Sequence, residues 1–153
     1  MAFDSYIGRS DAKIDKGCRI YIPSSFRKVM GEETTFVARL DMTERYLVVY
    51  TRAAWDKLVD SLKSRASEWD VDDQEVILQI NDEAIHLQID DQGRFQIPKK
   101  IAEFLEFKGD VTFAGMTDRF AIWGKERYDA FRATRPSLKE AMEAFNKRHN
   151  PNQ

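Results

Sequence analysis

One short pattern occurs twice in the chain, and this duplication constrains the fold more than any other feature of the sequence. The first copy begins at Asp15 and reads DKGCRIYIPSSFR, and the second begins at Asp90 and reads DDQGRFQIPKKIA. At an offset of 75 residues, an Asp, an Arg, an Ile and a Pro coincide in the two copies. Self-similarity at a fixed spacing indicates that the chain is built from two copies of one structural unit.

The likeness continues beyond this motif. The segment MTERY at residues 42–46 is echoed by MTDRF at residues 116–120. The apolar run that ends at Tyr50 is echoed by one that ends at Trp123, and an aromatic-bearing helical stretch follows each. Each unit therefore has the same predicted order of turn, strand, proline, short helix, hairpin and helix.

Local residue preferences predict how each motif folds. Asp favours turns because its side chain accepts hydrogen bonds from nearby backbone N–H groups, and Gly adopts a positive φ without strain. The β-branched and aromatic residues of 19–22 and 94–97 favour strands. Pro23 ends the first strand, and we expect a helix over Ser24–Met30 with Ser24 or Ser25 as its cap.

The remaining elements follow from hydrophobic periodicity and from turn residues. We expect strands within 3–10, at Thr35–Leu40, Tyr46–Tyr50 and Ala84–Ile89, a hairpin over Val111–Trp123, and helices at Ala53–Ser67, Lys99–Glu106, from Lys125 and at Leu138–His149. Residues 75–80 fit a helix or a strand. Trp55, Trp69, Trp123 and Tyr128 are predicted to pack in the core or at an interface.

These elements predict an α+β fold with four segments. The first unit spans residues 5–52, and a connecting helix with an acidic linker spans 53–75. The second unit spans 76–124, and a C-terminal helical segment with a loose tail spans 125–153. Nine acidic residues and no Lys or Arg lie between Ala66 and Gly93, and the acidic stretch Glu68–Glu75 is the natural boundary between the two units.

The charge distribution is more informative than the net charge of −2. The first 28 residues hold six Lys and Arg against three Asp, so one face can be basic although the whole chain is mildly acidic. No apolar run is long enough to cross a membrane, and the N-terminus lacks the apolar core of a signal peptide. With the single Cys, these features predict a cytoplasmic protein.

The pattern D-x-(K/Q)-G-R-hydrophobic-x-(I/V)-P, followed by a short helix, resembles the SpoVT-AbrB type of DNA-binding unit. Two such units with matched hairpins resemble the MraZ family of bacterial transcriptional regulators. The resemblance implies two pseudo-symmetric units in a swapped-hairpin, double-psi-like β-barrel with flanking helices, and a homo-oligomeric ring of several chains. It also implies Arg19 and Arg94 as the arginines that contact DNA.

The same resemblance implies a nucleoid-associated regulator, a repressor of its own division and cell-wall gene cluster that binds repeated elements of double-stranded DNA upstream of its operon. A planar guanidinium suits phosphate or the guanine O6 and N7 atoms. As a group, the lysines and arginine around the motifs add attraction for phosphate; they are Arg9, Lys13, Lys16, Lys99 and Lys100.

The first motif departs from the family pattern, because Gly17-Cys18 replaces the usual Lys-Gly pair. Cys18 stands where the pattern has Gly, and a residue with a side chain rarely adopts a positive φ. Two outcomes are open: Gly17 adopts the unusual conformation, or the turn differs from that of the second unit. Lys16, one position earlier, is a candidate to replace the missing positive charge.

Two other functions remain as alternatives to DNA-dependent regulation. One is a structural or partner-binding ring, and the other is an antitoxin-like regulator, since AbrB-type units also occur in antitoxins. An enzyme is not expected, because the sequence contains no recognisable nucleophile–base set, phosphate loop or metal motif. No catalytic residue, metal ligand, cofactor or small-molecule substrate is predicted.

Overall fold

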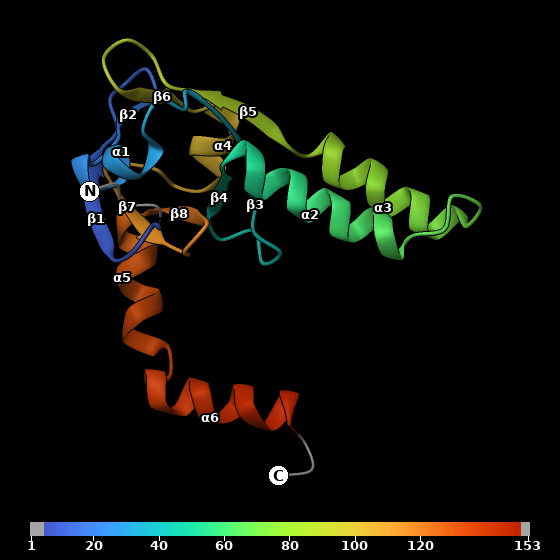
Figure 1. Ribbon diagram of the computed structural model, residues 1–153. Coiled ribbons are helices and arrows are strands. Elements are labelled where there is room, and N and C mark those ends of the chain that lie inside the picture. Colours follow the sequence, from blue (N-terminus) through green and yellow to red (C-terminus); the bar gives the residue numbers. More distant parts are fainter. Residues whose placement is uncertain (1–4, 151–153) are drawn as a thin grey trace.

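The computed structural model describes residues 5–150 and is a mixed α+β fold, as the sequence predicts (Figure 1). The strands are β1 (Arg9–Lys13), β2 (Arg19–Tyr21), β3 (Thr35–Leu40), β4 (Leu47–Tyr50), β5 (Ile85–Gln88), β6 (Arg94–Gln96), β7 (Asp110–Gly115) and β8 (Arg119–Gly124). The helices are α1 (Ser24–Met30), α2 (Arg52–Arg65), α3 (Val71–Asp82), α4 (Lys99–Phe104), α5 (Lys125–Thr134) and α6 (Leu138–His149).

The two repeats are interlaced rather than side by side. One antiparallel sheet has the strand order β1-β7-β8-β4-β3-β5, and a separate two-stranded ribbon pairs β2 with β6. The first strand of each repeat therefore pairs with the hairpin of the other repeat: β1 with β7, and β5 with β3. β4 and β8 also pair across the repeats. Neither repeat completes its sheet without the other.

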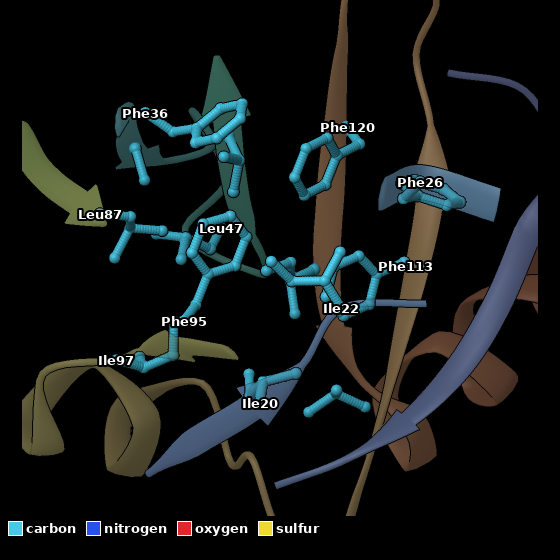
Figure 2. Close-up of a cluster of buried hydrophobic side chains, with 14 of the residues drawn as sticks. Ile20, Ile22, Phe26, Phe36, Leu47, Leu87, Phe95, Ile97, Phe113 and Phe120 are labelled. Carbon is cyan, nitrogen blue, oxygen red and sulfur yellow. The ribbon is translucent and has the colours of Figure 1, made fainter. Parts of the chain in front are cut away.

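A core of aliphatic and aromatic side chains lies between the sheet and the ribbon (Figure 2). Ile20 and Phe95 enter it from the ribbon, and Phe113 and Phe120 enter it from the second hairpin. Phe26 of α1 packs edge-on against both hairpin rings at 5.5 and 5.4 Å between ring centroids. Because the ribbon buries one face in this core, the register of its strands is tightly specified.

An aromatic pair fastens one helix of each repeat to the outside of the sheet. Trp55 of α2 packs against Tyr50 with centroids 5.5 Å apart, and Tyr128 of α5 packs against Trp123 with centroids 5.4 Å apart. These contacts confirm the predicted packing of Trp55, Trp123 and Tyr128. Trp69 differs, because its side chain is 91% exposed in the loop between α2 and α3 and packs in no core.

Two expectations about local structure are wrong, and one choice left open by the sequence is decided. The predicted strand at 3–10 is instead β1, which begins after Gly8 at a φ of +81°; Tyr6 makes only an isolated bridge to Thr117, and residues 3–4 lie outside the described chain. Neither Ser24 nor Ser25 caps α1, because Pro23 occupies the N-cap position without a side-chain hydrogen bond. Residues 75–80, which fitted helix or strand, are helical.

The acidic stretch is also more ordered than a simple linker, since α3 begins within it. Asp70 caps this helix by accepting a 2.9 Å hydrogen bond from the backbone N–H of Asp73. Asp72 and Asp73 then lie in the first turn, where a negative charge interacts favourably with the helix dipole and stabilises the helix. α2 and α3 form a helical hairpin that projects from the sheet (Figure 1).

Candidate nucleic-acid interface

The two motifs meet in the β2–β6 ribbon, although they lie 75 residues apart in the sequence. The strands are antiparallel and place Arg19 opposite Gln96 and Tyr21 opposite Arg94. Between these pairs, Ile20 opposes Phe95, and both of those side chains are fully buried. Because side chains alternate along a strand, the other four residues share the outer face of the ribbon.

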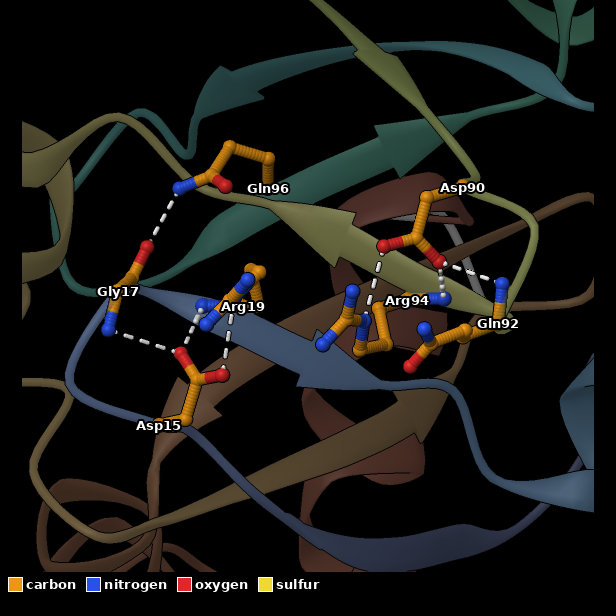
Figure 3. Close-up of polar contacts among 7 residues, drawn as sticks. All are labelled: Asp15, Gly17, Arg19, Asp90, Gln92, Arg94 and Gln96. Carbon is orange, nitrogen blue, oxygen red and sulfur yellow. Dashed lines mark hydrogen bonds and ion pairs between the residues drawn. The ribbon is translucent and has the colours of Figure 1, made fainter.

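An aspartate organises the turn before each arginine (Figure 3). Asp15 Oδ1 accepts hydrogen bonds of 2.9 Å from the backbone N–H groups of Gly17 and Arg19. Asp90 Oδ1 accepts hydrogen bonds of 2.9 Å from the N–H groups of Gln92 and Arg94. The two turns therefore have the same hydrogen-bond pattern, as expected of aspartates at these positions.

The second carboxylate oxygen of each aspartate holds the guanidinium that follows. Arg19 Nε donates to Asp15 Oδ2 at 2.9 Å, and Arg94 Nε donates to Asp90 Oδ2 at 2.8 Å. This contact uses Nε alone, so it leaves both Nη groups of each guanidinium without a hydrogen bond to the aspartate. Within residues 5–150, no Nη group of either arginine donates a hydrogen bond. Each arginine is thus oriented with Nη donors that make no hydrogen bond to the described chain, and the side chain of Arg19 is more exposed than that of Arg94.

These hydrogen bonds lower the pKa of both aspartates. For Asp15 the largest cause is the hydrogen bond from the Arg19 backbone, and the nearby guanidinium adds to it. For Asp90, desolvation acts to raise the pKa, but the hydrogen bonds from the backbone and side chain of Arg94 and from Gln92 outweigh it. The pKa of Arg94 is raised, chiefly by its hydrogen bond to Asp90. Both carboxylates are therefore ionised at neutral pH.

The first turn has the geometry of the second despite its different sequence. Cys18 adopts a φ of +61°, and Gly93 at the equivalent position adopts +76°. Their N–H groups donate equivalent 3.0 Å hydrogen bonds, to the carbonyls of Asp15 and Asp90. Both expectations for this turn are therefore wrong: Gly17 does not take over the unusual conformation, and the turn does not change. Cys18 itself adopts a backbone conformation that costs a residue with a side chain about 1–2 kcal/mol.

Of the other predicted basic residues, the four lysines lie beside the first motif or on α4, and Arg9 lies farther away. Lys16 and Lys99 line one surface hollow with Asp15, so the first motif and α4 bring them together. Lys13 ends β1 next to this turn and forms an ion pair with Asp110 at 3.3 Å. Lys100 is exposed on α4 beside Lys99, whereas Arg9 lies at the other end of β1, paired with Ala114 in the sheet.

Three further residues belong to this face and were not among the predicted site residues. Arg27 of α1 lies beside the second turn, where its Nε would be 3.7 Å from a Cβ at position 93. Tyr21 and Gln96 are exposed on the ribbon, and Tyr21 lies against the Arg94 guanidinium with its ring centroid 5.5 Å away. Alternation along the predicted strands was the signal that could have identified Tyr21 and Gln96.

The arginines of the echoed hairpin segments have a different environment. Arg45 of the first repeat lies over the ring of Trp123 at 5.4 Å, and Arg119 of the second lies over Tyr50 at 5.3 Å. Each arginine therefore covers an aromatic residue at or next to the end of a strand of the other repeat. These reciprocal cation–π contacts stabilise the interlaced sheet, and they explain why both segments carry an arginine.

Among residues 5–150, no group of three or more His, Cys, Asp or Glu side chains is arranged to hold a metal ion. In the same range, the structure contains no helix with both the length and the apolar composition needed to cross a membrane.

The fold and this face define a two-repeat α+β protein that presents a pair of aspartate-held arginines on a short ribbon. A model of the family described as "MraZ protein, putative antitoxin-like" matches residues 6–76 and 81–148. The chain belongs to the MraZ family, as the repeated motifs predicted.

Curated relatives agree with this assignment. The "Transcriptional regulator MraZ" of Bacteroides fragilis is 31% identical over 124 residues, which cover 80% of this chain and 78% of the relative. A protein of the same name from Caldanaerobacter subterraneus subsp. tengcongensis is 29% identical over 138 residues, which cover 90% and 94%. The aligned lengths of 124 and 138 residues are longer than one repeat, so the similarity extends over both repeats of this chain.

Proposed function

We propose that the chain is a sequence-specific DNA-binding transcriptional regulator and not an enzyme. The observation that carries this proposal is the pair of oriented arginines on the outer face of the β2–β6 ribbon. The relatives are named as transcriptional regulators, which supports the same class of function for this chain.

The ribbon has a shape and chemistry suited to the major groove, which admits a two-stranded β-ribbon. Arg19 and Arg94 would donate their Nη groups to guanine O6 and N7 or to phosphate, and Gln96 could pair with adenine. The surrounding cations would neutralise phosphates and fix the orientation on the duplex; they are Lys13, Lys16, Arg27, Lys99 and Lys100, with Arg9 more distant. Tyr21 would keep the Arg94 side chain extended.

The wider architecture of the proposal follows the family resemblance. The interlaced pairing supports a swapped-hairpin, double-psi-like barrel made of repeats 5–52 and 76–124, joined by segment 53–75 and followed by segment 125–153. Several chains would form a ring, in which repeated weak contacts gain affinity from effective concentration. The target would be repeated double-stranded DNA upstream of its own operon, which it would repress as a cytoplasmic, nucleoid-associated protein.

The main alternative is a partner-binding ring that does not use DNA. The exposed apolar side chains of the acidic α2–α3 hairpin favour this alternative, because such a surface suits a protein partner better than a nucleic acid. An antitoxin-like regulator is a third possibility, suggested by the family description.

The decisive experiment measures binding of the full chain to a fluorescent duplex from its own upstream region and to a scrambled duplex, across a salt series. We expect the wild type to prefer its own region and to lose affinity steeply as salt rises, because binding releases counterions. Arg19→Ala and Arg94→Ala should each weaken specific binding by roughly tenfold or more, the value of one bidentate base contact. Arg65→Ala, on the far α2 helix, is the matched control and should bind normally.

Lys16→Ala and Lys99→Ala should behave differently from the arginine variants. A phosphate contact carries no sequence information, so these changes should weaken both duplexes alike and reduce the salt slope by about one. Salt-independent binding, or equal binding of both duplexes by the wild type, would contradict the proposal. An intact oligomer without any duplex binding would favour the partner-binding ring.

A further inference from the structure

Helix α6 is an amphipathic helix without a packing partner in its own chain. Every residue from 132 to 150 is exposed, and Leu138, Met142 and Phe145 expose 79, 47 and 47% of their surface. These residues recur at i, i+4 and i+7, so they form one apolar stripe, with the His149 ring 4.3 Å from that of Phe145. Figure 1 shows α6 extending away from the sheet, beyond α5.

The sequence nevertheless specifies this helix strongly. Ser137 caps the helix: its Oγ accepts a hydrogen bond from the Glu140 N–H at 3.2 Å and donates one to the Glu140 carboxylate at 3.1 Å. Its last turn carries Lys147, Arg148 and His149. A helix of this length is only marginally stable alone in water, so a partner that covers the stripe is needed to hold it.

The α2–α3 hairpin has a complementary surface. α3 has no buried residue, and its Leu78 is 63% exposed on the face that also carries Val71, Glu75 and Asp82. Trp69 is almost fully exposed at the tip of the same hairpin. Along this face apolar and acidic side chains alternate, in the order Val71, Glu75, Leu78 and Asp82.

The charges of the two surfaces are opposite. The tip of the hairpin and α3, from Ala66 to Glu83, have seven acidic residues and no Lys or Arg, whereas α2 has four Lys and Arg against two Asp. The segment Arg132 to Arg148 has five Lys and Arg against two Glu, so it is the α3 side of the hairpin that complements it. On α6, Lys139 and Arg148 lie beside the apolar stripe. Opposite charges at the rim of a hydrophobic contact favour encounter and set the orientation of the partners.

We propose that the apolar stripe of α6 in one copy of the chain docks on the acidic α2–α3 hairpin of a second copy. This contact links neighbouring copies head to tail. Such a contact closes into a ring when the rotation between successive copies permits it. This inference specifies the subunit contact of the proposed ring and rests on that part of the proposed function. It does not depend on DNA binding.

The test is a disulfide cross-link between two populations of the full chain, both with Cys18→Gly so that no other thiol is present. One population carries Phe145→Cys and the other carries Leu78→Cys with an affinity tag that changes its size. After mixing and mild oxidation, we expect a cross-linked species with the mass of one chain from each population. Lys147→Cys replaces Phe145→Cys in the control, because position 147 lies on the opposite face of α6, and it should give little of this species.

A second variant tests the contact without a cross-link. Phe145→Asp places a charge in the stripe and should weaken self-association by roughly tenfold or more, measured as mass against concentration by light scattering. Glu143→Gln, on the other side of α6, should retain the wild-type mass. An unchanged mass for Phe145→Asp, or equal cross-linking through positions 145 and 147, would overturn the inference.

The two proposals fail in distinguishable ways. Missing cross-links in a chain that still binds its own upstream duplex through Arg19 and Arg94 would overturn the docking contact alone. Cross-linking at the expected positions without duplex binding would overturn the DNA-binding function alone.

Discussion

The turns that precede Arg19 and Arg94 have different sequences and the same geometry. One contains Gly17-Cys18 and the other Gln92-Gly93, yet each aspartate accepts the same hydrogen bonds and each arginine is held through Nε. The aspartate and the arginine thus determine the turn, while the residue directly before the arginine adopts the conformation that the turn requires. In the first repeat that residue is Cys18, at a φ of +61°.

The surroundings of the two arginines differ more than their turns do. The Arg19 side chain is 42% exposed, whereas that of Arg94 is 15% exposed. The register explains part of this difference, because Tyr21 lies across the ribbon from Arg94 and covers its guanidinium, while Gln96 lies opposite Arg19 and donates its side-chain amide to the Gly17 carbonyl. Pseudo-symmetry of the backbone therefore does not make the two motifs chemically equivalent.

Truncating either of the two buried residues that lie between the arginines in the ribbon should have the largest effect on stability. Phe95 and Ile20 are both fully buried beneath the ribbon. Phe95→Ala should reduce the free energy of unfolding by about 3–5 kcal/mol and Ile20→Ala by about 2–5 kcal/mol, because each leaves a cavity. Urea denaturation measures both, with the exposed His86→Ala of β5 as control. A small cost for Phe95→Ala would contradict the view that the ribbon is anchored by its inner face.

Exchanging the residues at the strained position should have an intermediate effect. Cys18→Gly should raise the free energy of unfolding by up to about 1 kcal/mol, because Gly adopts a positive φ without strain but adds freedom to the unfolded chain. Gly93→Ala should lower it by about 1–2 kcal/mol. Cys18→Ala is the matched control, since it removes the thiol and keeps the strain. Equal stabilities of Cys18→Gly and Cys18→Ala would show that the conformation is not strained.

Acidification should destabilise both turns, and this is the smallest of the three predicted effects on stability. The folded-state pKa of Asp15 and Asp90 lies below the ordinary value of 3.8, so their contribution to stability is complete above that pH and is lost as the pH falls through the lower, folded-state pKa. The variant with Asp15→Asn and Asp90→Asn should therefore lose less stability than the wild type on acidification below about pH 4. Thermal unfolding from pH 6 to pH 2.5 measures the two slopes. Parallel slopes would contradict the role of these carboxylates.

Much of the fold could be predicted because local chemistry determines it. The periodic or strongly capped segments, such as Thr35–Leu40, Ser24–Met30 and Leu138–His149, have the bounds expected from the sequence. The Asp-centred turns formed as predicted because their hydrogen bonds join residues at most four positions apart. The segment 75–80 could not be assigned, because its apolar run fits both periods and only its packing beside α2 decides between them.

The echoed hairpin segments illustrate what sequence likeness can conceal. In the first hairpin the N–H of Asp41 donates to the carbonyl of Tyr46, and in the second that of Met116 donates to Arg119, so the first turn is longer by two residues. Met42 and Met116 match in the sequence but occupy different places. Asp41 accounts for the longer turn, since its carboxylate accepts hydrogen bonds from the N–H groups of Thr43, Arg45 and Tyr46.

The sequence by itself determined that the chain is a duplicated α+β unit, where its turns and most of its helices lie, and which arginines each turn holds, since these depend on contacts between near neighbours. Only the tertiary structure decided that the repeats exchange strands, that Tyr21 and Gln96 share a face with Arg19 and Arg94, that Cys18 adopts a positive φ, and that α6 lies uncovered. Each of these depends on pairing between segments far apart in the chain, where register and packing outweigh local preference.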